Sequence, residues 1–210
     1  MKRSLFRALG LAATIIAAIA LQPAMARSPS IIDAAQDLVA SARGSSAHEA
    51  PTGLQLESAF SPRGGCVQLV EKAIGSARSE IRMLAYGFTN PSVVNALVAA
   101  HKRGVDVRVA VDYKANFSED RSGKGKAALN LLVNAGIPVR VVSVYPIHHD
   151  KSQVIDRKTV QTGSFNYTTA AEKSNSENVL VVWNDPQLAS SYLRHWERNW
   201  SQGRDYKSSY

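Results

Sequence analysis

Apolar segments of strand length alternate with segments of helix length between Leu54 and Val144, and this alternation constrains the fold more than any other feature. From position 105 to 111 a valine occupies every second position, which is the period of a strand. The strand candidates are 54–60, 81–88, 105–111 and 138–144, and the helix candidates between them are 66–76, 91–103 and 124–135. Such an order predicts an α/β fold with a mixed, largely parallel central β-sheet and helices on both faces.

Local signals mark the ends of the helices. Asn90 and Pro91 predict a helix start, because the asparagine side chain can accept from free backbone amides and proline has no amide hydrogen to leave unpaired. Gly104 and Gly136 are expected to end two helices, since glycine readily adopts the left-handed conformation found there. Beyond position 144 the pattern predicts a hairpin, a strand over 178–183 and a C-terminal helix from 186 to about 200.

The N-terminal segment is typical of an export signal. Basic residues precede an apolar run over 8–21, and Ala24-Met25-Ala26 has the small-x-small pattern of a signal peptidase site. We therefore expect residues 1–26 to be a signal peptide, 27–53 an N-terminal segment or linker, and 54–210 the main domain of a secreted, periplasmic protein. An uncleaved anchor is the alternative; once the signal peptide is removed, no stable membrane association is expected.

Charge and cysteine content narrow the choice of partner. The formal net charge is +8, and the chain remains basic without its first 26 residues. A basic surface favours nucleic acid or an anionic membrane. Cys66 is the only cysteine and opens an apolar helical segment, which predicts a packed thiol rather than a catalytic one.

Residues 147–168, IHHDKSQVIDRKTVQTGSFNYT, carry polar residues among alternating apolar ones and predict a hairpin. Side chains alternate between the two faces of a strand. His149 and Lys151 are therefore expected to share one face, and His148 to lie on the other.

The turn of this hairpin predicts which residues lie opposite one another. A symmetric turn centred on Arg157 and Lys158 places Lys151 opposite Ser164, and His149 opposite Asn166. A four-residue loop would keep the same register. All four side chains would then converge on one patch.

Such a patch suits chemistry on a phosphodiester. The imidazole of His149 can attack phosphorus. The Lys151 ammonium, the Ser164 hydroxyl and the Asn166 amide can hold the non-bridging oxygens as negative charge builds on them.

An imidazole in this role needs a carboxylate to orient it. Glu177 is the candidate, because the strand that follows it can lie beside the hairpin. Asp156 is the alternative, but it lies at the far end of the hairpin, where a structural role in the turn is expected.

The spacing His149-x-Lys151, four residues, Asp156, six residues, Gly163-Ser164 and then Asn166 resembles the HKD motif of the phospholipase D superfamily. The resemblance extends to the order of strands and helices from Leu54 onward. The small size, export signal and single motif are similar to the compact, EDTA-resistant bacterial endonucleases of that family.

The resemblance implies covalent phosphohistidine chemistry without a metal or another cofactor. Because the chain carries one motif, it implies a homodimer in which His149 from each subunit meets at the interface. One His149 would attack phosphorus and the other would act as acid and base. Lys151 and Asn166 would bind phosphate, Ser164 would support His149 or the phosphate, and Glu177 would hold the imidazole.

A metal site formed by His148, His149 and Asp150 is an alternative for the same segment. Neighbouring strand residues face opposite ways, so the three cannot chelate one ion without a kink. We therefore expect no metal site. His101 and His195 are expected to face solvent on their helices.

Two groups of residues could contact nucleic acid outside the hairpin. A basic cluster could either meet the phosphate backbone or form a solvated loop; its members are Lys114, Arg121, Lys124 and Lys126. Tyr145, Phe165 and Tyr167 flank the hairpin and could stack on bases, although Tyr145 and Phe165 could equally belong to the core.

The sequence thus predicts a metal-independent phosphodiesterase, a non-specific endonuclease that hydrolyses DNA and possibly RNA. One alternative is a phospholipase D or phosphatidyl transferase that acts on phospholipid with the same residues. A second is a basic nucleic-acid-binding module without catalysis, which would account for the charge but not for the clustered polar residues.

Overall fold

The computed structural model describes residues 53–208, so the expected signal peptide and all but the last residue of the expected linker lie outside the described residues. The strands are β1 (Gln55–Ser61), β2 (Glu80–Ala85), β3 (Asp106–Asp112), β4 (Val139–Val142), β5 (Lys151–Ile155), β6 (Thr159–Gly163), β7 (Glu177–Trp183) and β8 (Arg204–Asp205). The helices are α2 (Cys66–Ser76), α3 (Pro91–Lys102), α4 (Lys124–Asn134), α5 (Thr169–Lys173), α6 (Pro186–Gln202) and the π-helical turn η1 (Lys114–Ser118).

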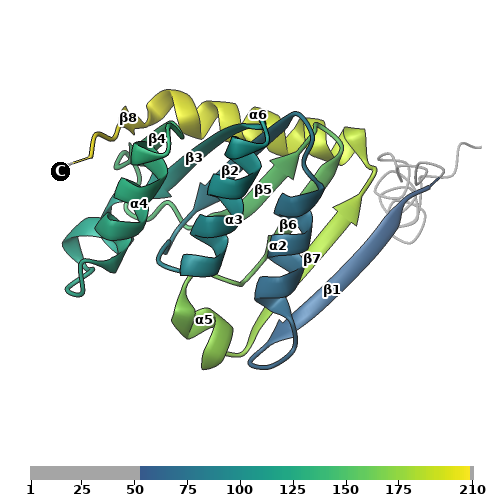
Figure 1. The fold of residues 1–210 in the computed structure, drawn as a ribbon, viewed down its shortest axis with the longest axis horizontal. Helices are drawn as coiled ribbons and strands as arrows, with labels where there is room; N and C mark the ends of the chain where they lie inside the picture. The colour runs from purple at the N-terminus through teal and green to yellow at the C-terminus, as the bar shows by residue number, and fades with distance from the viewer. Residues whose placement is uncertain (1–52, 209–210) are drawn as a thin grey trace, which may run out of the picture. The chain divides into compact units, whose positions relative to one another are not determined.

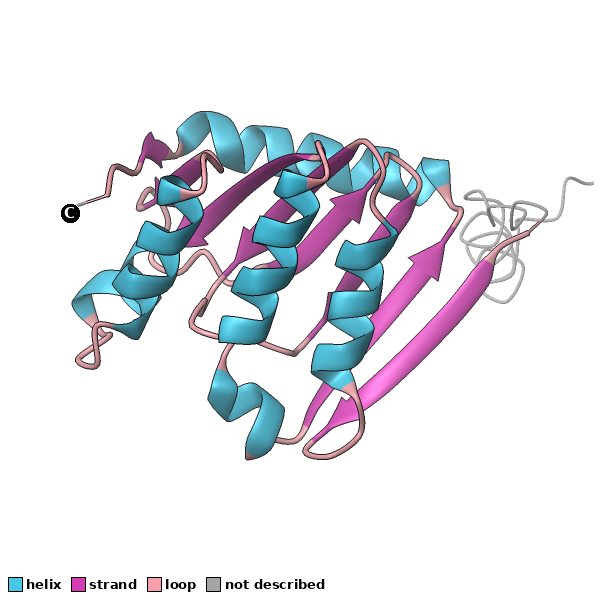
Figure 2. Ribbon diagram, in the orientation of Figure 1, coloured by secondary structure: helices cyan, strands magenta, loops and turns pink. Residues whose placement is uncertain are grey.

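The strands form one sheet in the order β1-β7-β6-β5-β2-β3-β4-β8. Helices α2, α3 and α4 lie side by side over one face, and α6 crosses the other (Figures 1 and 2). The predicted α/β class, the mixed sheet and the helices on both faces are confirmed.

The expectation that the sheet is largely parallel is wrong for the described residues. Parallel pairing joins β2 to β3 and β3 to β4, whereas the other neighbouring pairs are antiparallel. The reason is that β5, β6 and β7, connected antiparallel to one another, insert between β1 and β2. The helical crossovers from β2 to β3 and from β3 to β4 keep those neighbours parallel.

The helix boundaries follow the local signals. Oδ1 of Asn90 accepts from the amides of Ser92 at 2.9 Å and Val93 at 3.4 Å, as expected of a cap. Gly104 and Gly136 have φ values of 92° and 88° beyond the ends of α3 and α4. In the described part of the chain, no helix is both long and apolar enough to cross a membrane.

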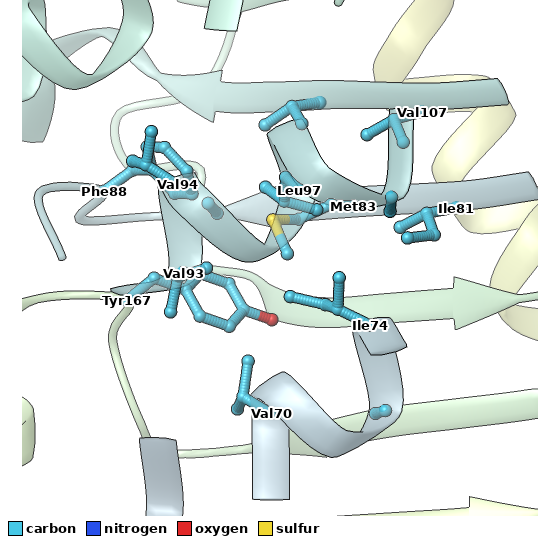
Figure 3. Packing of buried hydrophobic residues seen from close by; sticks show 14 of the residues in the cluster. Val70, Ile74, Ile81, Met83, Phe88, Val93, Val94, Leu97, Val107 and Tyr167 are labelled. Atoms are coloured by element: carbon cyan, nitrogen blue, oxygen red, sulfur yellow. The ribbon is translucent and has the colours of Figure 1, made fainter. Parts of the chain in front are cut away.

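The main core lies between the sheet and the layer of α2, α3 and α4. Figure 3 shows side chains of α2 and α3, such as Ile74 and Leu97, packed against Met83 of the sheet and against Tyr167. Cys66 is buried in the same cluster, as predicted, and burial raises the pKa of its thiol. On the other face, Trp196 of α6 packs against Leu84 and its neighbours.

The ends of several strands lie at one edge of this sheet. The carboxyl ends of β2, β3 and β4 lie there because these strands are parallel neighbours. Lys151, the first residue of β5, pairs with Ala85, the last of β2. Gly163, the last residue of β6, pairs with Val179 near the start of β7. Most of the polar residues singled out from the sequence lie at this edge.

Candidate active site

The hairpin β5–β6 is present, but its register differs from the prediction. Val154 pairs with Val160 and Ile155 with Thr159, one residue away from the expected alignment. The predicted opposition of Lys151 to Ser164, and of His149 to Asn166, is therefore wrong.

The cause is a three-residue turn over 156–158. Asp156 and Arg157 both adopt left-handed backbone conformations, with φ values of 51° and 57°. The amide of Lys158 donates to the carbonyl of Ile155 at 3.1 Å. The turn is centred on Arg157, whereas the predicted turn was centred between Arg157 and Lys158, and this difference shifts the pairing by one residue.

His149 lies in the loop just before β5, and its side chain is exposed. Its ring meets the ring of Tyr86 edge-on, with centroids 4.5 Å apart and an interplanar angle of 65°. Within residues 53–208, neither ring nitrogen of His149 has a hydrogen-bond partner. The imidazole is thus held by an aromatic contact and leaves both nitrogens available for chemistry.

Lys151 is buried at the start of β5 and points to the same aromatic ring. Its Nζ lies 5.0 Å from the ring centroid of Tyr86 and donates to the carbonyl of His149 at 2.8 Å. Burial lowers the pKa of Lys151, although the charges of Asp150 and Glu177 act in the opposite direction. A cation this close to His149 is suited to binding an anionic oxygen.

Ser164 and Glu177 form a hydrogen-bonded pair. The Ser164 hydroxyl donates to Oε2 of Glu177 at 2.6 Å and accepts from the amide of Asn178 at 3.1 Å. Oε1 of Glu177 accepts from Asn175 at 2.9 Å. Among the described residues, Glu177 makes no hydrogen bond to His149, so its expected role in holding the imidazole stays a prediction.

Gly163 explains why a glycine precedes Ser164. A Cβ at this position would lie 2.2 Å from the carbonyl oxygen of Asn178. Because no side chain fits there, glycine lets β6 approach β7 closely enough for Ser164 to reach Glu177.

Asn166 lies beside the loop that follows β2. Its Cβ is 3.9 Å from the position that a Cβ on Gly87 would occupy. Its Oδ1 is buried and has no hydrogen-bond partner within residues 53–208. An unpaired amide oxygen can accept from a bound water or a ligand hydroxyl, and the amide nitrogen of the same side chain can donate to a phosphate oxygen.

Asp156 lies at the far end of β5, away from His149. Its carboxylate accepts from the amides of Arg78, Ser79 and Glu80 at 2.8 to 3.2 Å. Burial alone would raise the pKa of Asp156, but these hydrogen bonds outweigh burial and lower it. The structure thus places Asp156 where the turn meets the loop before β2, as expected for a structural role.

A second polar cluster lies next to His149 and was not predicted. Nε2 of His195 is 3.0 Å from Oδ1 of Asp150, so His195 does not simply face solvent. His148 is buried on the same side, and its Nε2 lies 3.3 Å from Oδ2 of Asp150 without the alignment of a hydrogen bond. Burial lowers the pKa of His148, with Asp150 and Asp112 acting in the opposite direction.

These residues line a pocket of about 350 Å³ that opens beside His149. No sequence pattern indicated the contact between His195 and Asp150, because the two residues are 45 positions apart in the chain. The described residues contain no group of three or more His, Cys, Asp or Glu side chains arranged to hold a metal ion.

The aromatic residues proposed for stacking lie mainly in the interior. Phe165 and Tyr167 are fully buried, so the stacking expected of Tyr167 is wrong and the core alternative is confirmed for Phe165. Tyr145 is half-buried, and its hydroxyl donates to Gln202 at 2.6 Å. The aromatic ring that contacts His149 is that of Tyr86, which the sequence pattern had placed in a strand.

The basic cluster lies around η1 and the start of α4. Its four side chains are exposed and, within the described chain, form no hydrogen bond or ion pair; they are those of Lys114, Arg121, Lys124 and Lys126. These side chains are exposed and could bind a polyanion, but no contact in the structure assigns them that role.

Known proteins resemble this chain in sequence and in fold. Residues 70–200 match the model of a family described as "Cardiolipin synthase, PLD-like domain". Among solved structures, the phospholipase D family member Nuc from Salmonella typhimurium is 50% identical, with a TM-score of 0.71 over 74% of this chain and 99% of that one.

Curated relatives carry lipid-related names. A protein named phospholipase D from Rickettsia felis is 39% identical over 142 residues, which cover 68% of each chain. A mouse protein named mitochondrial cardiolipin hydrolase is 33% identical over 139 residues, which cover 66% of this chain and 60% of that protein.

Proposed function

Because this chain belongs to the phospholipase D superfamily, in a branch similar to Nuc, we propose that it is an exported, periplasmic endonuclease that hydrolyses DNA without a metal, with RNA as a second candidate substrate. The observation that carries the proposal is the convergence of His149 and Lys151 on the ring of Tyr86. The Ser164–Glu177 pair lies at the same edge of the sheet.

The proposed reaction has two steps. A ring nitrogen of His149 forms a bond to phosphorus while the bond from phosphorus to the leaving oxygen breaks, and the partner subunit's His149 gives a proton to that oxygen. The partner subunit's His149 then takes a proton from water, which attacks the phosphohistidine and releases His149. Exposure of His149 in the single subunit supports a place for it at a dimer interface.

The remaining residues bind and orient. Lys151 and the Asn166 amide hold the non-bridging oxygens, where negative charge builds in the transition state. Ser164 and Glu177 support the imidazole or the phosphate through their short hydrogen bond.

The test is nicking of supercoiled plasmid in EDTA by the wild type and by His149→Ala. We expect the wild type to cut and the variant to lose activity by several orders of magnitude, since it lacks the nucleophile. His101→Gln is the matched control, because that histidine lies on α3 and its ring contacts the carbonyl of Val105. Equal cutting by wild type and His149→Ala, or cutting only after magnesium is added, would contradict the proposal.

The proposed contribution of His149 from both subunits can be tested by mixing wild-type and variant subunits. After subunit exchange with an excess of His149→Ala, wild-type activity should fall more than dilution explains, because mixed dimers lack one of the two histidines. Activity proportional to the wild-type concentration would show that one subunit is sufficient.

Phospholipid cleavage is the second candidate, and one observation favours it besides the names of the relatives. Ile147, which lines the pocket beside His149, is 53% exposed and gives the site an apolar edge. Cardiolipin and phosphatidylcholine vesicles incubated with the same two proteins test this candidate. Release of lipid headgroups with DNA and RNA left intact would replace the nuclease proposal.

Non-catalytic binding is the third candidate. A salt-sensitive shift of DNA on a gel without cleavage products would support it.

A further inference from the structure

An exposed aromatic side chain lies one strand away from the candidate active site. Tyr113 directly follows β3 and is 46% exposed. Its ring stacks on that of Phe117, with centroids 5.6 Å apart and an interplanar angle of 15°. Phe117 in turn contacts the ring of Tyr206, with centroids 5.5 Å apart. The outer ring of this stack therefore has an open face and a fixed orientation.

The stack borders a pocket of about 380 Å³ that combines apolar walls with a cation; its lining residues are Tyr113, Phe117, Val141, Ser143, Arg204 and Tyr206. Asp205, the neighbour of Arg204, is ion-paired with Arg140 at 2.7 Å. In the described part of the chain, the side chain of Arg204 itself has no hydrogen bond or ion pair, and neither has that of Lys114 beside Tyr113. A flat apolar surface with unpaired cations at its border is complementary to a nucleotide.

Hydrogen bonds connect this aromatic stack to the active-site loops. Within η1, Nδ2 of Asn116 donates to the carbonyl of Tyr86 at 2.6 Å, and its Oδ1 accepts from the amide of Phe88 at 2.9 Å. The carboxylate of Asp112 accepts from the amides of His148 at 2.8 Å and Ala115 at 2.7 Å. The segment that carries Tyr113 is thus joined to both loops that hold His149.

Tyr113 and Tyr86, the residue whose ring contacts His149, follow neighbouring strands. Tyr86 and Tyr113 follow the carboxyl ends of β2 and β3, which are parallel neighbours. Neighbouring strands are about 4.8 Å apart. A strand of DNA advances about 3.4 Å per nucleotide when stacked. A separation of one strand corresponds to one or two nucleotides, so we expect the next base or the one after it to reach Tyr113 when a phosphate is bound at His149.

We propose that Tyr113, supported by Phe117, stacks on an unpaired base of the nucleic-acid strand whose phosphate occupies the active site, with Arg204 and Lys114 facing the neighbouring phosphates. This inference rests on the proposed function and adds a subsite to it. Because stacking on a tyrosine requires an exposed base face, the subsite selects single-stranded or locally unpaired strands. It does not distinguish one base from another.

Binding in the His149→Ala background tests the subsite without cleavage. Fluorescence anisotropy compares a short oligothymidylate with an abasic tetrahydrofuran oligomer of the same length. We expect Tyr113→Leu to weaken binding of oligothymidylate by at least about fivefold, the lower end for one stacked base, and to leave the abasic oligomer unchanged. Tyr113→Phe keeps the ring and should bind both oligomers as the parent does.

The control is Leu131→Ala, which removes an apolar side chain on α4 that is 58% exposed and should change neither affinity. Equal weakening of both oligomers by Tyr113→Leu, or no weakening, overturns the stacking subsite. Failure of the wild type to cut any nucleic acid overturns the proposed function instead. The difference between the two oligomers still decides the subsite in that case.

Discussion

Nε2 of His195 on α6 lies 3.0 Å from Oδ1 of Asp150, the residue between His149 and Lys151. Arg198 approaches the other ring nitrogen of His195 at 2.6 Å. Since arginine can only donate, Nδ1 must accept, and Nε2 must carry the proton that is donated to Asp150. Helix α6, which packs on the opposite face of the sheet from α2 and α3, thereby fixes the start of the strand that carries Lys151.

We predict that His195→Ala lowers kcat/KM by about tenfold, because a small displacement of His149 and Lys151 is costly when they must meet one phosphate. The free energy of unfolding should fall by about 1 kcal/mol for the lost hydrogen bond. His195→Gln, which can still donate to Asp150, should recover part of the activity. Steady-state kinetics and thermal unfolding of both variants make the measurement; an equal loss of stability with unchanged kinetics would assign His195 a structural role alone.

Activity should decline at alkaline pH earlier than an ordinary lysine would allow. Burial lowers the pKa of Lys151, so its charge, needed for phosphate, is lost at lower pH than usual. Lys151→Arg keeps a positive charge across this range, and we expect it to flatten the alkaline limb of log kcat/KM against pH at a reduced maximum rate. An unchanged alkaline limb in Lys151→Arg would assign that limb to another group.

Ser164 and Glu177 should behave as a unit. Their 2.6 Å hydrogen bond ends on a carboxylate, and such bonds contribute about 1.5–3 kcal/mol when the partner is charged. Ser164→Ala and Glu177→Gln are each expected to lower activity, and the double variant to be little worse than the more damaged single variant. A double-mutant cycle on kcat/KM measures this coupling, and additive effects would indicate that the two residues act independently.

Asp156→Asn should destabilise the protein without removing the chemistry. The pKa of Asp156 is lowered in the fold, so its stabilising contribution is present above the unfolded pKa of about 3.9 and is lost as pH falls through the folded value. We expect a loss of about 1–3 kcal/mol in the free energy of unfolding at neutral pH, and a smaller difference from wild type below about pH 4.

Urea unfolding at several pH values measures this effect, with Asp205→Asn as the control. The exposed ion pair of Asp205 with Arg140 should contribute no more than about 1 kcal/mol. If Asp156→Asn kept full stability but abolished cleavage, Asp156 would have a role in the reaction that its position does not explain.

The helices and the motif were predictable because their signals are local. Asn90 caps α3 within its own first turn, and Gly104 and Gly136 follow α3 and α4, so short segments contain all the required information. The six residue types of the motif likewise made the resemblance to the family recognisable in one short segment, and residues 70–200 match the model of that family.

Features that depend on contacts between distant segments were not predictable. The hairpin register follows from left-handed residues at Asp156 and Arg157, and Asp156 is held by amides 76 to 78 residues away. The antiparallel pairing of β5 with β2 likewise depends on where the hairpin inserts into the sheet.

The sequence by itself determined the order of the main elements, the boundaries of the main helices and the candidate site residues, because these depend on neighbours along the chain. Only the tertiary structure decided which side chains meet: Tyr86 with His149, Ser164 with Glu177, and His195 with Asp150. It also decided that Phe165 and Tyr167 are buried while Tyr113 is exposed. The physical reason is that burial and contact are set by how the helices and the inserted strands pack on the sheet, which periodicity within one segment does not encode.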